Sequence, residues 1–438
     1  MKKKLFIFFM ILTIISILLL AVGCKIQEDE IPDNDNGLSS GDNDNNINSG
    51  DNTQNHTHTF ANEWSTDKQY HWHASTCEHV LTEDKAKHIF DDNGMCNICK
   101  YYSSYGFTFQ LNSNNDAYTI TGLEDDNDDT QIVLPSSYSG KPVTSIDKNA
   151  FKGCDNLTSV TIPTSITKIE QGAFDGCNGL VGVYITDMLS WLNIQFQGND
   201  SNPLDYAKKL YLNNQLVTKL TIPRDLNSFN IFAIYNCDDL TEIIVEEQNA
   251  TYKSDGNCLI EKETNRLIFG CKNSIIPSYI TAIGSAAFEG CKGLTSVEIP
   301  SGVEHIGFDA FRNCTDLTTV KIQPGVKYIY DGAFQNCSKL TNIALPQGII
   351  DIRAQAFSGC KSLTTIAIPS GTQNIGQGAF TSCANLTSAT IPVGVESIGA
   401  FAFLNCPSLT IYCAETSKPI NWEDTWHSNC PVEWGYNI

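Results

Sequence analysis

The sequence predicts a repeat solenoid of α/β type with mainly β content, in which the chain winds through a series of similar coils. A cysteine recurs every 23 residues, and each stands three residues after a phenylalanine and three before a leucine. The six positions are Cys291, Cys314, Cys337, Cys360, Cys383 and Cys406. The same frame surrounds Cys154 and Cys177. Units this short cannot bury their apolar side chains alone, so the period indicates coils that stack on one another.

Within each coil, the order of residues predicts a short strand, a turn and a return segment. The pattern Leu294-x-x-Val297-x-Ile299 has the spacing of a leucine-rich repeat, and its apolar residues alternate with polar ones as in a half-buried strand. Pro300 has no N–H for a strand ladder and is expected to end the strand. We therefore expect a right-handed leucine-rich-repeat solenoid of about nine coils over residues 147–412.

The cysteines of this repeat are expected to be buried thiols rather than disulfides. Equivalent side chains of stacked coils point in parallel into the core, which is a poor geometry for a sulfur–sulfur bond. Each cysteine then packs as a small apolar residue. Near the C-terminus, Cys413 and Cys430 form the pair that most favours a disulfide after export.

Two longer intervals predict insertions between coils. Cys237 follows Cys177 by 60 residues and precedes Cys291 by 54, whereas one period accounts for 23. The extra residues fall at about 183–220 and 246–274. The second insertion contains Asp255-Gly256 between strand-like runs, a sequence typical of a hairpin turn.

Both ends of a solenoid need a cover, because an open coil exposes core and unpaired strand edge. Residues 103–146 are expected to form an N-terminal β cap, since they contain two runs that alternate like paired strands. Residues 413–438 are expected to form the C-terminal cap. This segment holds three of the six tryptophans, which would plug the end: Trp422, Trp426 and Trp434.

The N-terminal residues predict export and lipid attachment. Three lysines precede an apolar stretch in residues 1–23, which is the plan of a secretory signal peptide. The stretch ends in Leu-Ala-Val-Gly-Cys and resembles a lipoprotein signal, so Cys24 is the expected lipid-attachment residue. An uncleaved membrane anchor is the alternative. We expect the protein on a bacterial cell surface, anchored to a membrane by lipid after secretion.

The mature chain is strongly acidic. Loss of the signal peptide removes three lysines, so 25 basic residues remain against 49 acidic ones, a net charge of −24. Such a chain repels phosphate backbones, which argues against a nucleic-acid partner. Residues 24–55 are rich in Asp, Asn, Ser and Gly and predict a disordered tether.

A small module at residues 56–102 concentrates histidine and cysteine and suggests a zinc ribbon. Six of the eight histidines lie between residues 56 and 88, and a C-x-x-C follows. The expected ligands of a structural zinc ion are Cys77, His79, Cys96 and Cys99, with His88 as a rival for one position. A disulfide between Cys96 and Cys99, or neither bond nor metal, remains an alternative. A site closed by protein ligands would be structural rather than catalytic.

We expect no enzyme, because no nucleophile, base and orienting acid stand in a known motif, and no phosphate-binding or dinucleotide motif occurs. The outward strand positions instead form a small, hydroxyl-rich and nearly uncharged surface. The candidate partner-binding residues on it are Glu298, Lys321, Thr319, Asn342, Thr365 and Thr390. The alternative is a solvent-facing surface selected only for β propensity.

The unit Ala-Phe-x-x-Cys-x-x-Leu-x-x-Val-x-Ile-Pro-x-x-Val-x-x-Ile-Gly resembles the Treponema-type leucine-rich repeat of BspA-like bacterial surface proteins. The resemblance covers residues 142–412 and includes the proline after the strand, which has slipped by one residue at Pro324. It implies a cell-surface protein, some relatives being adhesins. The expected function is therefore a lipid-anchored surface protein whose solenoid binds an extracellular protein or glycan. The alternative is a zinc-binding surface lipoprotein in which the solenoid is only scaffold.

Overall fold

The computed structural model describes residues 60–66, 70–75, 82–87, 98, 106–124, 129–198 and 200–437. The chain divides into a unit from Met1 to Thr57 and a unit from His58 to Ile438. The first unit, with the expected signal peptide, Cys24 and the whole of the expected tether, lies outside the described residues. In the described ranges, no helix is long and apolar enough to cross a membrane.

The second unit begins with a small antiparallel sheet in the His/Cys-rich segment. Its strands, in the order β1-β2-β3, are β1 (Phe60–Thr66), β2 (Tyr70–Ser75) and β3 (Thr82–Lys87). Trp64 lies opposite His73, and His71 is buried in the middle strand. The ammonium group of Lys85 lies 5.5 Å from the centre of the Trp72 ring, so a cation–π contact supports this sheet.

The N-terminal end of the solenoid is covered by paired strands. Antiparallel strands β4 (Phe107–Leu111) and β5 (Tyr118–Leu123) add to β8 (Lys141–Ile146), which β7 (Ser137–Tyr138) also joins. Phe107 packs edge-on against Phe151 with ring centres 6.4 Å apart. The aromatic rings of the cap therefore close the first coil of the core.

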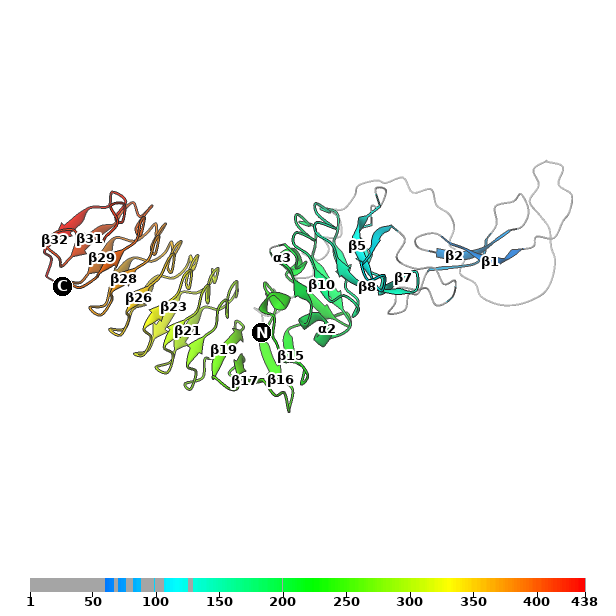
Figure 1. The fold of residues 1–438 in the computed structure, drawn as a ribbon, viewed down its shortest axis with the longest axis horizontal. Coiled ribbons are helices and arrows are strands. Elements are labelled where there is room, and N and C mark those ends of the chain that lie inside the picture. Colours follow the sequence, from blue (N-terminus) through cyan, green and yellow to red (C-terminus); the bar gives the residue numbers. More distant parts are fainter. Residues whose placement is uncertain are drawn as a thin grey trace, which may run out of the picture. The chain divides into compact units, whose positions relative to one another are not determined.

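One side of each coil contributes a strand to a set of mostly parallel sheets, whose outward side we call the strand face (Figure 1). The first sheet joins β6 (Gln131–Val133), β9 (Ser159–Thr161), β11 (Gly182–Ile185) and β13 (Leu210–Leu212), with β14 (Gln215–Leu216) on its edge. A pair follows, β15 (Lys219–Ile222) and β16 (Glu242–Val245). The next sheet joins β21 (Ser296–Ile299), β23 (Thr319–Ile322) and β25 (Asn342–Ala344). The last joins β27 (Thr365–Ala367), β29 (Ser388–Ile391), β31 (Thr410–Cys413) and β32 (Val432–Trp434).

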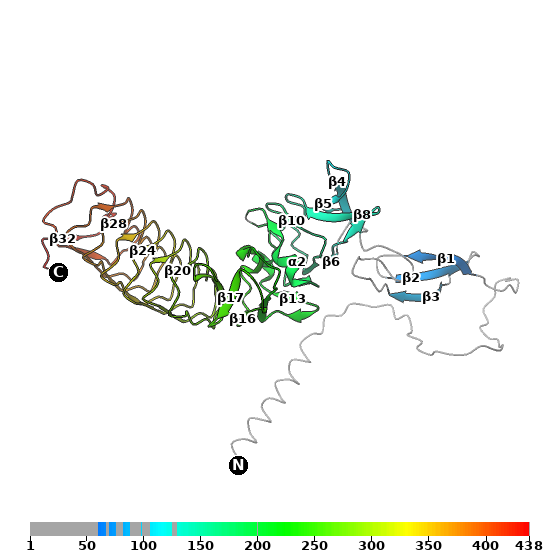
Figure 2. The same cartoon turned by 60° about the horizontal axis from the view of Figure 1, so that its bottom comes forward.

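The return segments form a second ladder, whose outward side we call the return face (Figure 2). Strand β8 continues through β10 (Lys168–Ile169) to β12 (Gln195–Phe196). A separate sheet starts with β17 (Tyr252–Asp255), β18 (Cys258–Glu261) and β19 (Arg266–Gly270). It continues through β20 (Ala282–Ile283), β22 (His305–Ile306), β24 (Tyr328–Ile329), β26 (Asp351–Ile352), β28 (Asn374–Ile375) and β30 (Ser397–Ile398). The predicted solenoid with mainly β content is thus confirmed.

The solenoid has about 14 turns, more than the nine expected. The difference arises because the caps and the irregular stretch also supply rungs. Strand β6 of the N-terminal cap pairs with β9, and β32 of the C-terminal cap pairs with β31. These rungs were missed because they do not keep the 23-residue spacing.

A column of phenylalanine rings forms the centre of the regular coils. Phe288, Phe311, Phe334, Phe357, Phe380 and Phe403 are fully buried. Adjacent rings are parallel, with centres between 5.0 Å and 5.4 Å apart. Each coil therefore presents the same ring to the next, and the core continues without a gap through this block.

The cysteine column is buried beside the phenylalanines and contains no disulfide, as expected from the geometry. All thirteen described cysteines are free. The thiol of Cys337 donates to the carbonyl of Phe311 at 3.1 Å, and the same bond recurs one coil further from Cys360 to Phe334 at 3.2 Å. From Cys314 to Cys383, each thiol thus adds a second hydrogen bond to a buried phenylalanine carbonyl of the preceding coil, a bond that alanine could not make.

The C-terminal cap closes the ring column with indole groups. Trp426 meets Phe403 edge-on at 6.1 Å, and Trp422 packs against Trp426 at 5.0 Å. The expected disulfide between Cys413 and Cys430 is wrong, because both residues are free. The Cys430 thiol instead donates to the carbonyl of Phe403 at 3.6 Å and continues the cysteine column into the cap.

The irregular stretch contains the helices α2 (Met188–Leu192) and α3 (Leu204–Ala207) and the 3-10 helix η1 (Ile231–Ile234). Both ladders are interrupted here, since β16 and β12 each end their sheets. The hydrophobic core accordingly forms two clusters, one from Phe107 to Cys271 and one from Cys258 to Cys430. The solenoid thus consists of an N-terminal block and a C-terminal block, which meet between residues 205 and 293.

Candidate interaction surface

The outward strand positions lie where the sequence pattern placed them. Val297 and Ile299 of β21 are buried, and Ser296 and Glu298 are exposed. The same alternation exposes Thr319 and Lys321, Asn342, and Thr365, while Thr390 is half-buried. The candidate partner-binding residues therefore share one face, in register across neighbouring coils.

The charged side chains on the regular coils of this face form one ion pair. The Lys321 ammonium group lies 2.9 Å from a carboxylate oxygen of Glu298, and the Gln323 amide donates to the same oxygen. The hydrogen bonds from Gln323 and Lys321 hold the pKa of Glu298 below its usual value. Further along, the outward residues of β25, β27 and β29 are uncharged, so most of this surface offers hydroxyl and amide groups.

Threonines line the edge at which each strand begins. The Thr318 hydroxyl donates to the Thr295 carbonyl at 2.9 Å, and Thr387 donates to Thr364 at 3.1 Å. The two threonines of each pair are 23 residues apart. These bonds tie successive coils together, so we assign this threonine row to stability rather than to binding.

A cleft opens on the strand face at the start of the C-terminal block. One wall is residues 272–278, and the other is residues 295–298 with Pro300. Glu298 lines the cleft, and Ile275 lines it with 76% of its surface exposed. A large apolar side chain exposed beside a cleft is a common mark of an interaction site.

Two tyrosine pairs flank the regular coils on the strand face, and sequence reasoning missed them. Tyr184 of β11 and Tyr211 of β13 stack with ring centres 4.6 Å apart. At the other end, Tyr412 of β31 packs against Tyr436 at 4.7 Å. Tyr184 and Tyr211 are 27 residues apart, outside the 23-residue frame, so their pairing was visible only after the insertion was placed.

A second group missed in the sequence lies on the return face. Phe308, Tyr330 and Arg353 stack in this order from three successive coils: the two rings are 4.9 Å apart, and the guanidinium lies 4.3 Å from the Tyr330 ring. Next to them, Asn374 links Asp351 and Ser397 by side-chain hydrogen bonds of 2.8 Å and 2.7 Å. The return face therefore presents aromatic rings together with charged, amide and hydroxyl side chains.

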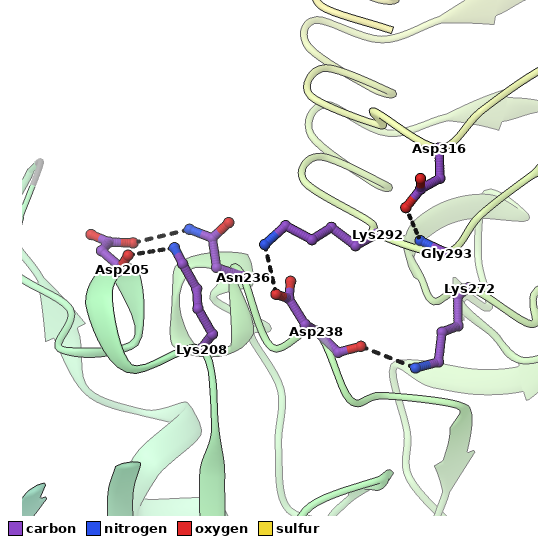
Figure 3. Close-up of polar contacts among 8 residues, drawn as sticks. All are labelled: Asp205, Lys208, Asn236, Asp238, Lys272, Lys292, Gly293 and Asp316. Atoms are coloured by element: carbon purple, nitrogen blue, oxygen red, sulfur yellow. Dashed lines mark hydrogen bonds and ion pairs between the residues drawn. The ribbon is translucent and has the colours of Figure 1, made fainter. Parts of the chain in front are cut away.

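The two blocks of the solenoid meet at a polar junction (Figure 3). Lys292 forms an ion pair of 2.8 Å with the Asp238 carboxylate, and Lys272 donates to the Asp238 carbonyl at 3.1 Å. On the other side of this contact, the Asn236 amide donates to Asp205 at 3.5 Å. Burial raises the pKa of Asp205 to about 6, so this carboxyl is held in an unfavourable environment for its charge.

The expected zinc and lipid sites lie in parts of the chain that the structure does not describe. Cys24, Cys77, His79, His88, Cys96 and Cys99 all lie outside the described residues. Among the residues that are described, no group of three or more His, Cys, Asp or Glu side chains is arranged to hold a metal ion. The zinc ribbon and the lipid attachment therefore stay predictions.

The repeat region of this chain is similar to known proteins. The BspA-type leucine-rich-repeat region matches residues 130–258, 259–370 and 304–430, in six copies. No curated protein matches the chain. A leucine-rich cell-surface protein of Faecalibacterium prausnitzii is similar, with 21% identity, a TM-score of 0.45, and coverage of 76% of this chain and 94% of that chain.

Two further solved structures are similar. The pneumococcal vaccine antigen PcpA has 18% identity and a TM-score of 0.47, over 76% of this chain and 98% of its own. A leucine-rich-repeat protein from Bacteroides ovatus has 21% identity and a TM-score of 0.37, over 75% of this chain and 98% of its own. Because the repeat match extends over more than half of the sequence, this chain belongs to the BspA-type leucine-rich-repeat family.

Proposed function

We propose that the protein is a lipid-anchored protein of the bacterial cell surface whose solenoid binds an extracellular protein through the strand face. The observation that carries this proposal is the register of exposed, mostly uncharged side chains across β21 to β29. Fixed on a continuous core, these side chains lose little freedom on binding, which favours recognition of an extended partner.

Membership in the family supports an extracellular partner, since leucine-rich-repeat solenoids use their exposed faces for binding. Function nevertheless depends on the surface and not on the fold. The acidic net charge of −21 favours partners that are neutral or basic where they meet this chain. No catalytic role is proposed.

The binding face is tested with a screen of residues 25–438 against immobilised matrix proteins and glycans. For a captured partner, Thr319→Arg and Thr365→Arg should weaken binding at least tenfold, because each places a long charged side chain on the face. Gln373→Arg adds the same charge at an exposed return position and is the matched control. Equal binding by all three variants would place the partner elsewhere.

The lipid anchor is proposed from the sequence of residues 1–24. The unaltered protein should incorporate a labelled fatty acid, and Cys24→Ser should abolish this incorporation. If the unaltered protein stays in the membrane without label, an uncleaved apolar anchor holds it instead.

A glycan partner is a second candidate, favoured by the aromatic group on the return face. The stacked Phe308, Tyr330 and Arg353 side chains lie beside the hydrogen-bonded Asp351, Asn374 and Ser397. Apolar rings next to convergent polar groups are typical of ligand sites. Tyr330→Ala should abolish any binding on a glycan array, whereas Thr365→Arg should leave it unchanged.

Zinc binding by the segment 56–102 is a third candidate, with Cys77, His79, Cys96 and Cys99 as ligands and His88 as the rival. Its role would be to stabilise a segment too short for a large core. One zinc ion per chain is expected by elemental analysis, and Cys96→Ser with Cys99→Ser should remove it. Absence of metal from the unaltered protein would reject this proposal.

A further inference from the structure

The first strand of the C-terminal block has one unpaired edge. β21 pairs only with β23, in the sheet order β21-β23-β25. On the β23 side of β21, the carbonyls of Thr295 and Ile299 accept hydrogen bonds from the backbone N–H groups of Thr319 and Gln323. Alternate residues of a parallel strand bond to opposite neighbours, so Ser296 and Glu298 direct their backbone N–H and C=O groups to the other edge.

That other edge faces the cleft. Between residues 272–278 and 295–300, which are described throughout, no backbone hydrogen bond is formed. At the later boundary between β25 and β27, a backbone bond from Thr364 to Thr341 at 3.3 Å still joins the two coils. The edge of β21 that faces residues 272–278 therefore lacks the backbone hydrogen bonds that join the two coils at the later boundary.

The inserted hairpin holds the rung that precedes β21. The N–H of Ile275 donates to the carbonyl of Gly256, in the turn between β17 and β18, at 2.7 Å. The side chains of Asn257 and Ser274 add hydrogen bonds between this turn and residues 273 and 274. In the preceding rung, the N–H of Ile275 is thus bonded to the hairpin and the N–H of Ser274 to the carbonyl of Cys271, and neither bonds to β21.

The cleft that results has the size and chemistry for a single extended segment. Its volume is about 540 Å³. Ile275 is exposed on one side, and Ser296 and Glu298 expose both their side chains and their unpaired edge on the other. Unpaired strand edges are templates for a further strand, in which main-chain bonds supply affinity and side-chain contacts supply specificity.

We propose that an extended peptide segment of a partner protein enters this cleft and adds to β21 as a strand. Its backbone pairs with Ser296 and Glu298, and one of its apolar side chains packs on Ile275. The segment needs a run of residues that can extend, without proline at the pairing positions. This inference rests on the proposed function, since it names the class of partner for one end of the strand face.

The test uses the mature chain and a fluorescent peptide with the sequence of Thr318–Gln323 between flanking lysines, because this segment already pairs with β21 along its other edge. Ser296→Pro removes an N–H that points into the cleft and leaves the bonds of β21 to β23 in place, although it also fixes the backbone angle φ at residue 296. Ile275→Asp places a charge on an exposed position. Each should weaken peptide binding at least tenfold while the thermal midpoint stays near that of the unaltered protein. A peptide N-methylated at alternate residues keeps its side chains and should not bind.

Amide hydrogen exchange provides a second measurement that does not depend on the variants. In the free protein, the amides of Ser296 and Glu298 should exchange faster than those of Thr319 and Lys321, and the peptide should protect them. Equal protection of both pairs in the free protein, or tight binding of the N-methylated peptide, would overturn the proposal. If deletion of residues 24–55 exposes these amides, the chain's own N-terminal segment occupies the cleft, and the partner peptide is likewise rejected.

Peptide binding and partner binding, measured on the same variant, distinguish the cleft proposal from the strand-face proposal. Thr365→Arg lies several coils away and should leave peptide binding unchanged, although it should weaken the captured partner. If the cleft binds the peptide and Thr365→Arg does not affect the partner, the strand-face proposal fails and the cleft stands. If the partner depends on Thr365 and the peptide does not bind, the cleft proposal fails alone.

Discussion

At the residue scale, the cysteines are part of the core architecture. From Cys314 to Cys406, each thiol of the column donates to a phenylalanine carbonyl of the preceding coil, as Cys314 does to Phe288 at 3.0 Å. The sequence predicted free, buried thiols there because the 23-residue spacing placed them in one column. It failed at Cys430, because this cysteine follows Trp426 by four residues rather than three and did not look like a member of the column.

Burial of these thiols makes stability sensitive to alkali. Burial raises the pKa of Cys360 to about 12, from an ordinary value of 9.0. The neutral thiol is therefore favoured in the folded state, and its contribution is complete below pH 9.0 and is lost as the pH rises toward 12. Between pH 8 and pH 10.5, urea unfolding of the native protein should lose roughly 1–2 kcal/mol more than that of Cys360→Ala.

The comparison needs Cys360→Ala at neutral pH as its reference, because the substitution also leaves a small cavity and removes one of the two hydrogen bonds to the Phe334 carbonyl. That fixed cost of about 1–2 kcal/mol should appear at pH 7. A pH profile that is parallel for the two proteins up to pH 10.5 would contradict the burial of this thiol.

At the scale of elements, the caps stabilise the ends of the ring column. Trp426 is fully buried and covers Phe403 edge-on. Trp426→Ala should lower the free energy of unfolding by about 3–5 kcal/mol, because a large cavity opens at the end of the core. Denaturant unfolding measures this loss. Trp434→Ala is the matched control, since Trp434 is 37% exposed and should cost much less.

The junction between the two blocks should respond to pH through Asp205. Burial raises its pKa to about 6, with Lys208 and Asn236 opposing the shift and Asp200 adding to it. Stability from the protonated carboxyl is present below the ordinary value of 3.8 and is lost as the pH rises through 6. Asp205→Asn should therefore lose less stability than the native protein between pH 4 and pH 6.5, by roughly 1–3 kcal/mol in thermal or urea unfolding. A Lys208→Met variant tests whether the nearby ammonium group moderates this effect.

The hairpin of the second insertion could be predicted from the sequence, but its hydrogen bonds to other segments could not. The Asp255-Gly256 turn predicted a hairpin, and β17 and β18 form it. The pattern did not show that this turn would take the backbone bonds of residue 275, because hydrogen bonds between distant segments leave no mark on local periodicity. The junction was missed for the same reason, since Asp238 and Lys292 are 54 residues apart and lie outside any motif.

At the scale of the whole molecule, the repeat predicted the solenoid and the outward residues of its strands, because strand alternation and coil stacking follow from spacing alone. Spacing could not predict the partner. Exposed residues such as Thr365 satisfy β propensity equally well whether or not a ligand covers them. The aromatic group around Tyr330 was missed because return segments vary in sequence, and only stacking of the coils brings Phe308 and Arg353 to its two sides.

The measurement that tests the central claim most directly is a hydrogen-exchange footprint of the mature chain with a partner captured in the screen. Binding through the strand face predicts slower exchange in Ser296–Ile299, Thr319–Ile322 and Thr365–Ala367, with no change in the return strands His305–Ile306 and Tyr328–Ile329. Protection confined to the return strands, or to residues 56–102, would contradict the claim that the strand face is the binding surface.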